Sequence, residues 1–215
     1  MHLLIYAMES SGASTFCYFV GQRVASIAII DVWSRNLSPS IESAHPVVAK
    51  ATVTMTRSAA DHIASFRPDR TILFTRDPVA VYESLTKYPY ANSFGTIEEK
   101  MRRFDDEFAQ GDWDAIIRYE DFVAQKTIVI ERLNALGWEC DRGFWETPRS
   151  LAEIRDFNVS KSSWCKHHFE NGWAFGNIKE GPISRRFALR LDKPDIVRMV
   201  SVLSPNLFAA YNSGQ

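Results

Sequence analysis

Small residues, hydroxyls and a glycine follow the first apolar segment of the chain. Residues 2–7 read His-Leu-Leu-Ile-Tyr-Ala, and residues 8–15 continue as Met-Glu-Ser-Ser-Gly-Ala-Ser-Thr. An amphipathic stretch over 13–25 follows directly. A strand that turns through such a loop into a helix leaves backbone N–H groups unpaired and pointing toward one spot, where they can bind phosphate. The loop therefore predicts a phosphate-ester ligand.

This loop departs from the nucleotide-binding motif Gly-x-x-x-x-Gly-Lys-Ser/Thr. Ala7 takes the first glycine position, Gly12 is kept, Ala13 stands at the lysine position, and Ser14 keeps the hydroxyl. The motif's lysine reaches the outer phosphates of a nucleoside triphosphate, so its absence disfavours ordinary ATP or GTP hydrolysis. A plain strand-to-helix turn with a serine cap is the alternative interpretation.

A second candidate group follows the apolar segment 71–75. That segment ends in Arg76-Asp77-Pro78, and Ser84 comes eight residues after the arginine. Proline favours the first turn of a helix, so we expect Arg76 at the strand's carboxyl end and Ser84 about two turns along the next helix. The arginine can make a bidentate contact with phosphate, and the serine hydroxyl adds a donor. The alternative is an Arg–Asp pair that only caps the helix.

Lys50 interrupts the apolar segment 46–53. Burying a lone ammonium group is costly, so this side chain is either paired or reaches past the end of its strand. In the second case it points into the same crevice as Gly12 and Arg76. The alternative is an edge strand on which Lys50 faces water.

Strands and helices alternate along the first two thirds of the chain. Apolar segments of strand length cover 2–7, 27–33, 47–53, 71–75 and 114–119, and amphipathic stretches cover 13–25, 57–65, 78–87, 96–109 and 121–136. This alternation predicts an α/β fold, a doubly wound parallel sheet of the P-loop type in three layers with helices on both faces. Ligands of such sheets bind beyond the carboxyl ends of the strands, where the residues above are expected.

The length of 215 residues and the 46% hydrophobic content predict a single domain over 1–215. Residues 157–181 show no sustained period, so we expect a lid over 157–187, followed by short helices from about Ser184 and from Pro194. The formal net charge of −1 gives no reason to expect nucleic acid as a partner.

The cysteines and the hydropathy favour a cytoplasmic protein. Cys17, Cys140 and Cys165 are far apart and form no Cys-x-x-Cys pair, which favours reduced thiols. We expect neither a signal peptide nor a membrane span, because no charged segment precedes the first apolar stretch and no run of eighteen apolar residues occurs.

Taken in order, these motifs resemble the sulfotransferases that use 3'-phosphoadenosine 5'-phosphosulfate. The resemblance rests on the loop Ser10-Ser11-Gly12-Ala13-Ser14 and on Arg76, Pro78 and Ser84. Arg118-Tyr119-Glu120-Asp121-Phe122 is similar to the family's Tyr-Glu-Asp-Leu segment, mainly a structural element behind the site. Residues 179–187, Lys-Glu-Gly-Pro-Ile-Ser-Arg-Arg-Phe, resemble the family's Lys-x-Gly-x-x-x-Arg-Trp stretch.

The resemblance implies a cofactor and its ligands. The 5'-phosphosulfate is expected on the amides and hydroxyls of Ser11, Gly12, Ala13, Ser14 and Thr15, and the 3'-phosphate on Arg76, Ser84, Lys179, Gly181 and Arg186. The implied reaction is in-line transfer of the sulfuryl group to a hydroxyl or amine, which leaves adenosine 3',5'-bisphosphate and requires no metal. The acceptor, a small molecule or a glycan, is not specified, nor is the oligomeric state.

Two departures from the family concern catalysis. Members commonly carry a lysine two residues before the loop glycine, where this chain has Ser10. The negative charge on the leaving group must then be stabilised by Lys50, by the helix N-terminus or by a lysine of the lid. Many members also carry Lys-Thr-His, and Lys50-Ala51-Thr52 lacks the histidine general base. Asp31 is the first candidate to replace it. Weaker candidates are Glu9, His45, His167 and His168.

Two other functions stay open. A P-loop nucleoside or small-molecule kinase is supported by the loop over 12–15 and by Asp31 at a strand end. A nucleotide-binding protein that has lost turnover is supported by the missing lysine and histidine.

Overall fold

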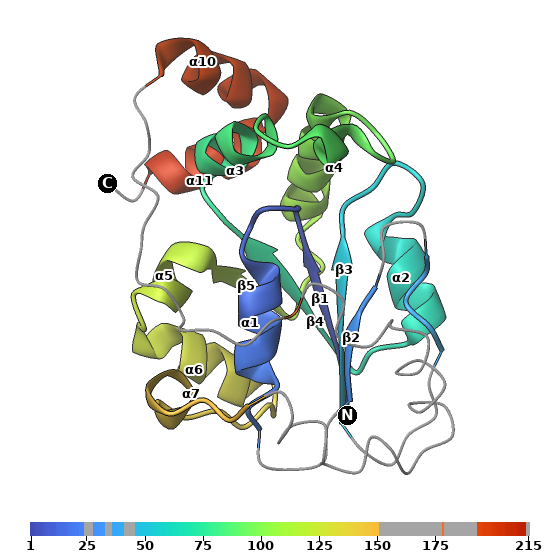
Figure 1. Ribbon diagram of the computed structural model, residues 1–215, viewed down its shortest axis with the longest axis vertical. Coiled ribbons are helices and arrows are strands. Elements are labelled where there is room, and N and C mark those ends of the chain that lie inside the picture. The colour runs from blue at the N-terminus through green and yellow to red at the C-terminus, as the bar shows by residue number, and fades with distance from the viewer. Residues whose placement is uncertain (24–27, 33–35, 41–45, 151–177, 179–192, 214–215) are drawn as a thin grey trace.

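The expected strands form one parallel sheet in the computed structural model, in the order β2-β3-β1-β4-β5 (Figure 1). The strands are β1 (His2–Ala7), β2 (Ala28–Asp31), β3 (Val47–Thr52), β4 (Arg70–Thr75) and β5 (Ala115–Arg118). Each falls within one residue of, or inside, a segment predicted from its apolar residues. The structure describes residues 1–23, 28–32, 36–40, 46–150, 178 and 193–213.

Helices cover both faces of the sheet, which confirms the predicted α/β class. They are α1 (Ala13–Val20), α2 (Ala59–Phe66), α3 (Pro78–Leu85), the 3₁₀ helix η1 (Pro89–Asn92), α4 (Ile97–Gln110), α5 (Tyr119–Val123), α6 (Thr127–Ala135), α7 (Gly143–Glu146), α10 (Pro194–Leu203) and α11 (Pro205–Asn212). Figure 1 shows α1, α5, α6 and α7 on one side of the sheet and α2 on the other. Helices α3, α10 and α11 gather beyond its carboxyl edge.

Alternation along β1 divides the core into two halves. Leu3 and Ile5 pack with α1 and α6, whereas Leu4 and Tyr6 pack on the opposite face with α2, α3 and α4. All four side chains are fully buried. A strand with both faces buried reads as a continuous apolar run, which is why the sequence shows a run there and not an alternating pattern.

Local capping sets where the helices of the second face begin. Ser58 and Asp61 form a reciprocal capping box at the start of α2, and Thr96 and Glu99 form another at the start of α4. Asp77 caps α3 by accepting a hydrogen bond from the Val79 N–H. These caps satisfy backbone N–H groups in the first turns of α2, α3 and α4.

The C-terminal half differs from the expectation in two places. The stretch 121–136 is not one helix, because Gln125 adopts a φ of 54° between α5 and α6 and so interrupts the helical backbone. After α10, which begins at Pro194 as predicted, Pro205 starts a further helix, α11. The helix expected from Ser184 and the lid over 157–187 lie outside the described residues, apart from Ile178.

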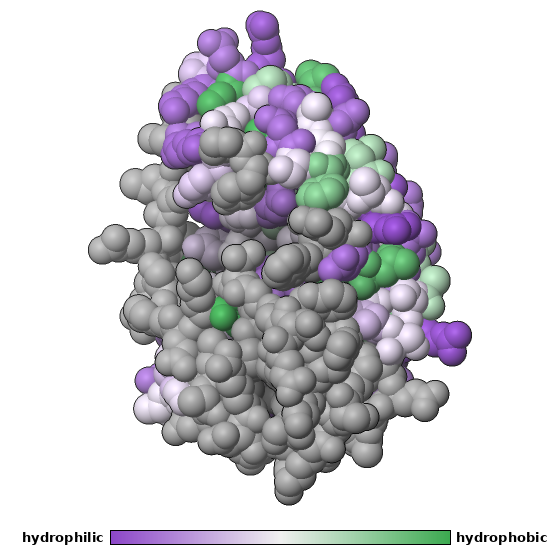
Figure 2. Space-filling view, turned by 45° about the vertical axis from the view of Figure 1, so that its right-hand side comes forward, coloured by the Kyte–Doolittle hydropathy of each residue, from purple (hydrophilic) through white to green (hydrophobic). Residues whose placement is uncertain are grey.

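The described surface is mainly hydrophilic on the face that Figure 2 displays, with hydrophobic side chains scattered among polar ones. Among the described residues, no helix combines the length and the apolar character that crossing a membrane requires.

Candidate active site

The loop between β1 and α1 has a tightly constrained backbone. Ser10 adopts a φ of 62° and Gly12 a φ of 88°, both in the left-handed region. A Cβ atom added to Gly12 would lie 2.6 Å from Cε2 of Tyr119. Glycine is therefore required here for two reasons: the backbone is in the left-handed region, and the Tyr119 ring leaves no room for a Cβ atom.

Unpaired donors cluster at the start of α1. The first helical hydrogen bond runs from the Phe16 N–H to the Gly12 carbonyl, so the N–H groups of Ala13, Ser14 and Thr15 have no acceptor within the helix. The hydroxyl of Ser11, a residue only 1% exposed, has no hydrogen-bond partner among the described residues. Buried polar atoms normally find partners, so this loop fits a ligand that accepts hydrogen bonds.

Arg76 lies against the same loop. Its guanidinium donates to the Ser10 carbonyl at 2.7 Å and stacks on the Tyr119 ring at 4.6 Å from the ring centroid. Asp77 caps α3, so the helix-capping role falls to the aspartate while the arginine turns toward the loop. Ser84 is half-buried near the end of α3, as the spacing predicted.

Lys50 is both paired and directed at the start of α1. It lies directly opposite Asp31 in the β2–β3 register, so the two side chains share one face of the sheet. The Lys50 ammonium lies 2.7 Å from Oδ1 of Asp31 and donates to Oγ of Ser14 at 2.9 Å. Strand β3 lies between β2 and β1, and Lys50 is 4% exposed, so the interpretation as a water-facing edge residue was wrong.

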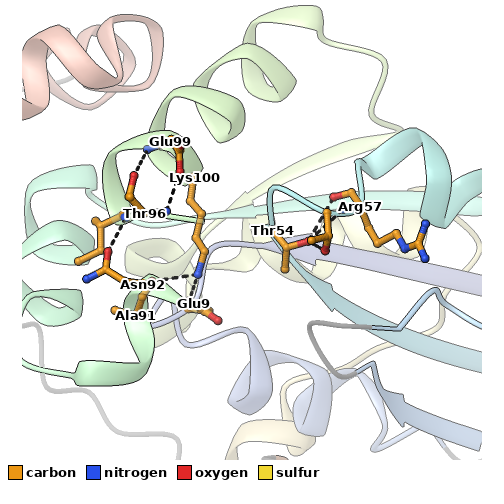
Figure 3. A network of polar contacts seen from close by, with 10 residues as sticks. Glu9, Thr54, Arg57, Ala91, Asn92, Thr96, Glu99 and Lys100 are labelled. Atoms are coloured by element: carbon orange, nitrogen blue, oxygen red, sulfur yellow. Dashed lines mark hydrogen bonds and ion pairs between the residues drawn. The ribbon is translucent and has the colours of Figure 1, made fainter. Parts of the chain in front are cut away.

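The weaker base candidate Glu9 is engaged by a lysine that the sequence reading missed. Lys100 of α4 donates to Oε2 of Glu9 at 3.0 Å (Figure 3). The signal for Lys100 is its position on the apolar face of α4, three residues after Ile97 and four before Phe104. A cation in such a position must be paired.

The segment after β5 supports the site through Tyr119 and Glu120. Tyr119 contacts both Gly12 and Arg76, as described above. Glu120 accepts from the Asp77 N–H at 3.0 Å and from the Tyr211 hydroxyl at 3.1 Å. Burial raises the pKa of the Glu120 carboxyl. Tyr211 belongs to α11, and no sequence pattern links that distant helix to Glu120.

Six predicted site residues lie outside the described residues: Lys179, Gly181, Arg186, His45, His167 and His168. Within the described part of the chain, no group of three or more histidine, cysteine, aspartate or glutamate side chains could hold a metal ion.

The comparisons with known proteins find structural likeness only. No protein-family model and no curated protein sequence matches the chain. Among solved structures, it is similar to retinol dehydratase in complex with androsterone and the inactive cofactor PAP, with 8% identity, a TM-score of 0.45, and coverage of 96% of this chain and 80% of that one. It is also similar to mouse sulfotransferase SULT7A1 complexed with PAP, with 12% identity, a TM-score of 0.38, and coverage of 99% and 82%. At these identities and TM-scores, neither likeness carries a function over to this chain.

Proposed function

We propose that this protein is a sulfotransferase that transfers a sulfuryl group from 3'-phosphoadenosine 5'-phosphosulfate to a hydroxyl or amine acceptor. The observation that carries the proposal is the hydrogen bond from Arg76 to the Ser10 carbonyl. It joins the loop after β1 and the arginine after β4 into one site at the carboxyl edge of the sheet. A nucleotide with a phosphate at the 3' position and an anionic group at the 5' position matches such a pair of sites.

The loop would hold the 5' end of the donor. The amides of residues 13–15 and the buried Ser11 hydroxyl supply hydrogen-bond donors without needing a lysine in the loop. Gly12 allows the backbone to approach the ligand closely. Such preorganised donors stabilise charge that develops on a transferring group.

Lys50 would supply the positive charge that the loop lacks. Its ammonium reaches Ser14 at the N-terminus of α1, whereas Ala13 and Ser10 stand where related motifs carry a lysine. The donor supplies an activated sulfuryl group: its bond to the bridging oxygen breaks as the bond to the acceptor forms. In this proposal, the Lys50 ammonium stabilises the negative charge left on that oxygen.

Asp31 is the proposed general base that takes the acceptor's proton, provided that its ion pair with Lys50 opens. It is 4% exposed and paired with Lys50, so it can contact an acceptor only if that pair opens. With the pair closed, Asp31 orients Lys50. Ser10 contributes its backbone carbonyl as the acceptor of the Arg76 hydrogen bond.

The 3'-phosphate would bind Arg76 and Ser84. The proposed site is completed by Lys179, Gly181 and Arg186, which belong to the stretch that resembles the family's C-terminal motif. The aromatic ring of Tyr119 holds the Arg76 guanidinium in place from one side, which reduces the side-chain entropy lost when a phosphate binds.

Thermal shift measurements test this proposal. Adenosine 3',5'-bisphosphate should raise the melting temperature, because a ligand that binds only the folded state stabilises it, and Mg-ATP should not. The variant Arg76→Ala should lose the shift. Arg70→Ala, which removes an exposed arginine from the opposite end of β4, should keep it.

Three results would contradict the proposed function. A shift with Mg-ATP alone would indicate a kinase. A shift in Arg76→Ala equal to that of the unmodified protein would mean that the pocket lies elsewhere. Binding of the bisphosphate without transfer of labelled sulfate to any hydroxyl or amine acceptor would indicate a nucleotide-binding protein without turnover.

A further inference from the structure

Lys100 is a fully buried cation whose charge is directed at the anion-binding loop. Its side chain is 0% exposed, and its ammonium donates to Oε2 of Glu9 at 3.0 Å and to the Ala91 carbonyl at 2.9 Å. Figure 3 shows the side chain extending from α4 toward these two partners. Glu9 itself is mostly buried, with 16% of its side chain exposed. A buried ion pair of this kind is costly to form and strongly destabilising to break.

Helix α4, which carries Lys100, is anchored by hydrogen bonds at its first turn and one turn beyond Lys100. The Thr96–Glu99 capping box fixes its first turn, and the Ile97 N–H donates to the side chain of Asn92 (Figure 3). One turn beyond Lys100, Arg103 donates to the Thr54 carbonyl in the loop after β3. Helix α4 therefore contacts two loops at the carboxyl edge of the sheet, the edge at which the proposed donor binds.

Glu9 places a negative charge next to an anion site. It immediately precedes Ser10 and lies two residues before the unpartnered Ser11 hydroxyl. An uncompensated carboxylate there would repel a phosphate or a phosphosulfate. The pairing with Lys100 cancels that charge and holds the loop through Glu9, while Arg76 holds it through the Ser10 carbonyl.

We propose that Lys100 is a positioning residue that makes the Glu9-containing loop able to accept an anion, by neutralising Glu9 and fixing the loop to α4. This inference rests on the proposed function, since it takes the 5' end of the nucleotide to be the anion. The charge balance gives it a definite sign. Loss of Lys100 leaves the loop negative, loss of Glu9 leaves it positive, and loss of both charges restores neutrality.

Isothermal titration with adenosine 3',5'-bisphosphate tests the sign. Lys100→Met should raise the dissociation constant about tenfold or more, and Glu9→Gln should lower it, because unpaired charges near the ligand act on its binding. The double variant Glu9→Gln/Lys100→Met should bind within about threefold of the unmodified protein, since both charges are removed together. The effect of Lys100→Met should shrink as salt is added.

A matched control variant separates this positioning role from a general effect of removing a lysine. Lys126→Met removes one partner of an exposed ion pair with Asp121 and should leave the dissociation constant unchanged. The inference is overturned if Lys100→Met binds like the unmodified protein, or if the double variant binds no better than Lys100→Met. Should Lys100→Met fail to fold, Glu9→Gln decides, because unchanged or weaker binding contradicts the proposal. If the unmodified protein does not bind the bisphosphate, the proposed function fails, and this inference fails with it.

Discussion

Some residues of the site can be predicted from sequence patterns, whereas the contacts of others become evident only from the fold. Arg76 is located by its place between an apolar strand and Pro78, and Gly12 by its place between β1 and α1. Lys50 is conspicuous because a lysine interrupts an apolar segment, yet the sequence left open whether it was paired or faced water. The pairing of Lys50 with Asp31 depends on the register between β2 and β3, which can be known only once these strands are known to be neighbours in the sheet.

The catalytic role proposed for Lys50 can be tested by removing its charge. Lys50→Met should lower the rate of sulfuryl transfer by about 10²-fold or more, the typical cost of losing one preorganised group that stabilises developing charge. The measurement is single-turnover transfer from labelled donor. Lys87→Met, at an exposed position just beyond α3, is the control and should retain the rate.

Stability has to be separated from chemistry in that experiment. Lys50→Met breaks the buried ion pair with Asp31, and breaking such a pair costs about 3–5 kcal/mol of stability. The double variant Asp31→Asn/Lys50→Met should regain much of that stability and still transfer slowly. A double variant with normal activity would contradict the role given to Lys50.

At the scale of elements, the strands were predicted more closely than the helices. The five strands follow from apolar runs. The capping boxes that begin α2 and α4, at Ser58 and Thr96, were not predicted. The break between α5 and α6 was missed because it depends on the positive φ of Gln125, a residue type that ordinarily favours the helical backbone.

Helix α2 carries a pH-dependent contact. His62 is 2% exposed, and its Nδ1 accepts a hydrogen bond from the Ser38 N–H at 3.2 Å. Burial lowers the pKa of His62 from 6.5 to about 4. The folded state therefore holds the imidazole neutral at pH values where the unfolded chain already binds a proton.

The expected consequence is a loss of stability in mild acid. This contribution is complete above about pH 6.5, decreases as the pH falls toward 4, and amounts to about 2 kcal/mol between pH 7 and pH 5. Urea unfolding at these two pH values measures it. His62→Gln should be less stable at pH 7 and should lose less stability on acidification; equal losses in both proteins would show that His62 does not titrate as described.

At the scale of the whole molecule, the residues proposed to bind the donor lie along one edge of the sheet. The loop after β1, Lys50 of β3 and Arg76 after β4 come from separate parts of the sequence and meet there because all five strands are parallel. That arrangement was predictable from the alternation of strands and helices. The contact of Tyr211 with Glu120 was not, because it joins residues 91 positions apart through two short helices without a recognisable motif.

The most direct test of the central claim is a crystal structure of the protein with adenosine 3',5'-bisphosphate. The proposal predicts the 5'-phosphate on the backbone amides at the start of α1 with the Ser11 hydroxyl, and the 3'-phosphate on Arg76 and Ser84. A nucleotide bound with neither phosphate within hydrogen-bond distance of these groups would contradict it.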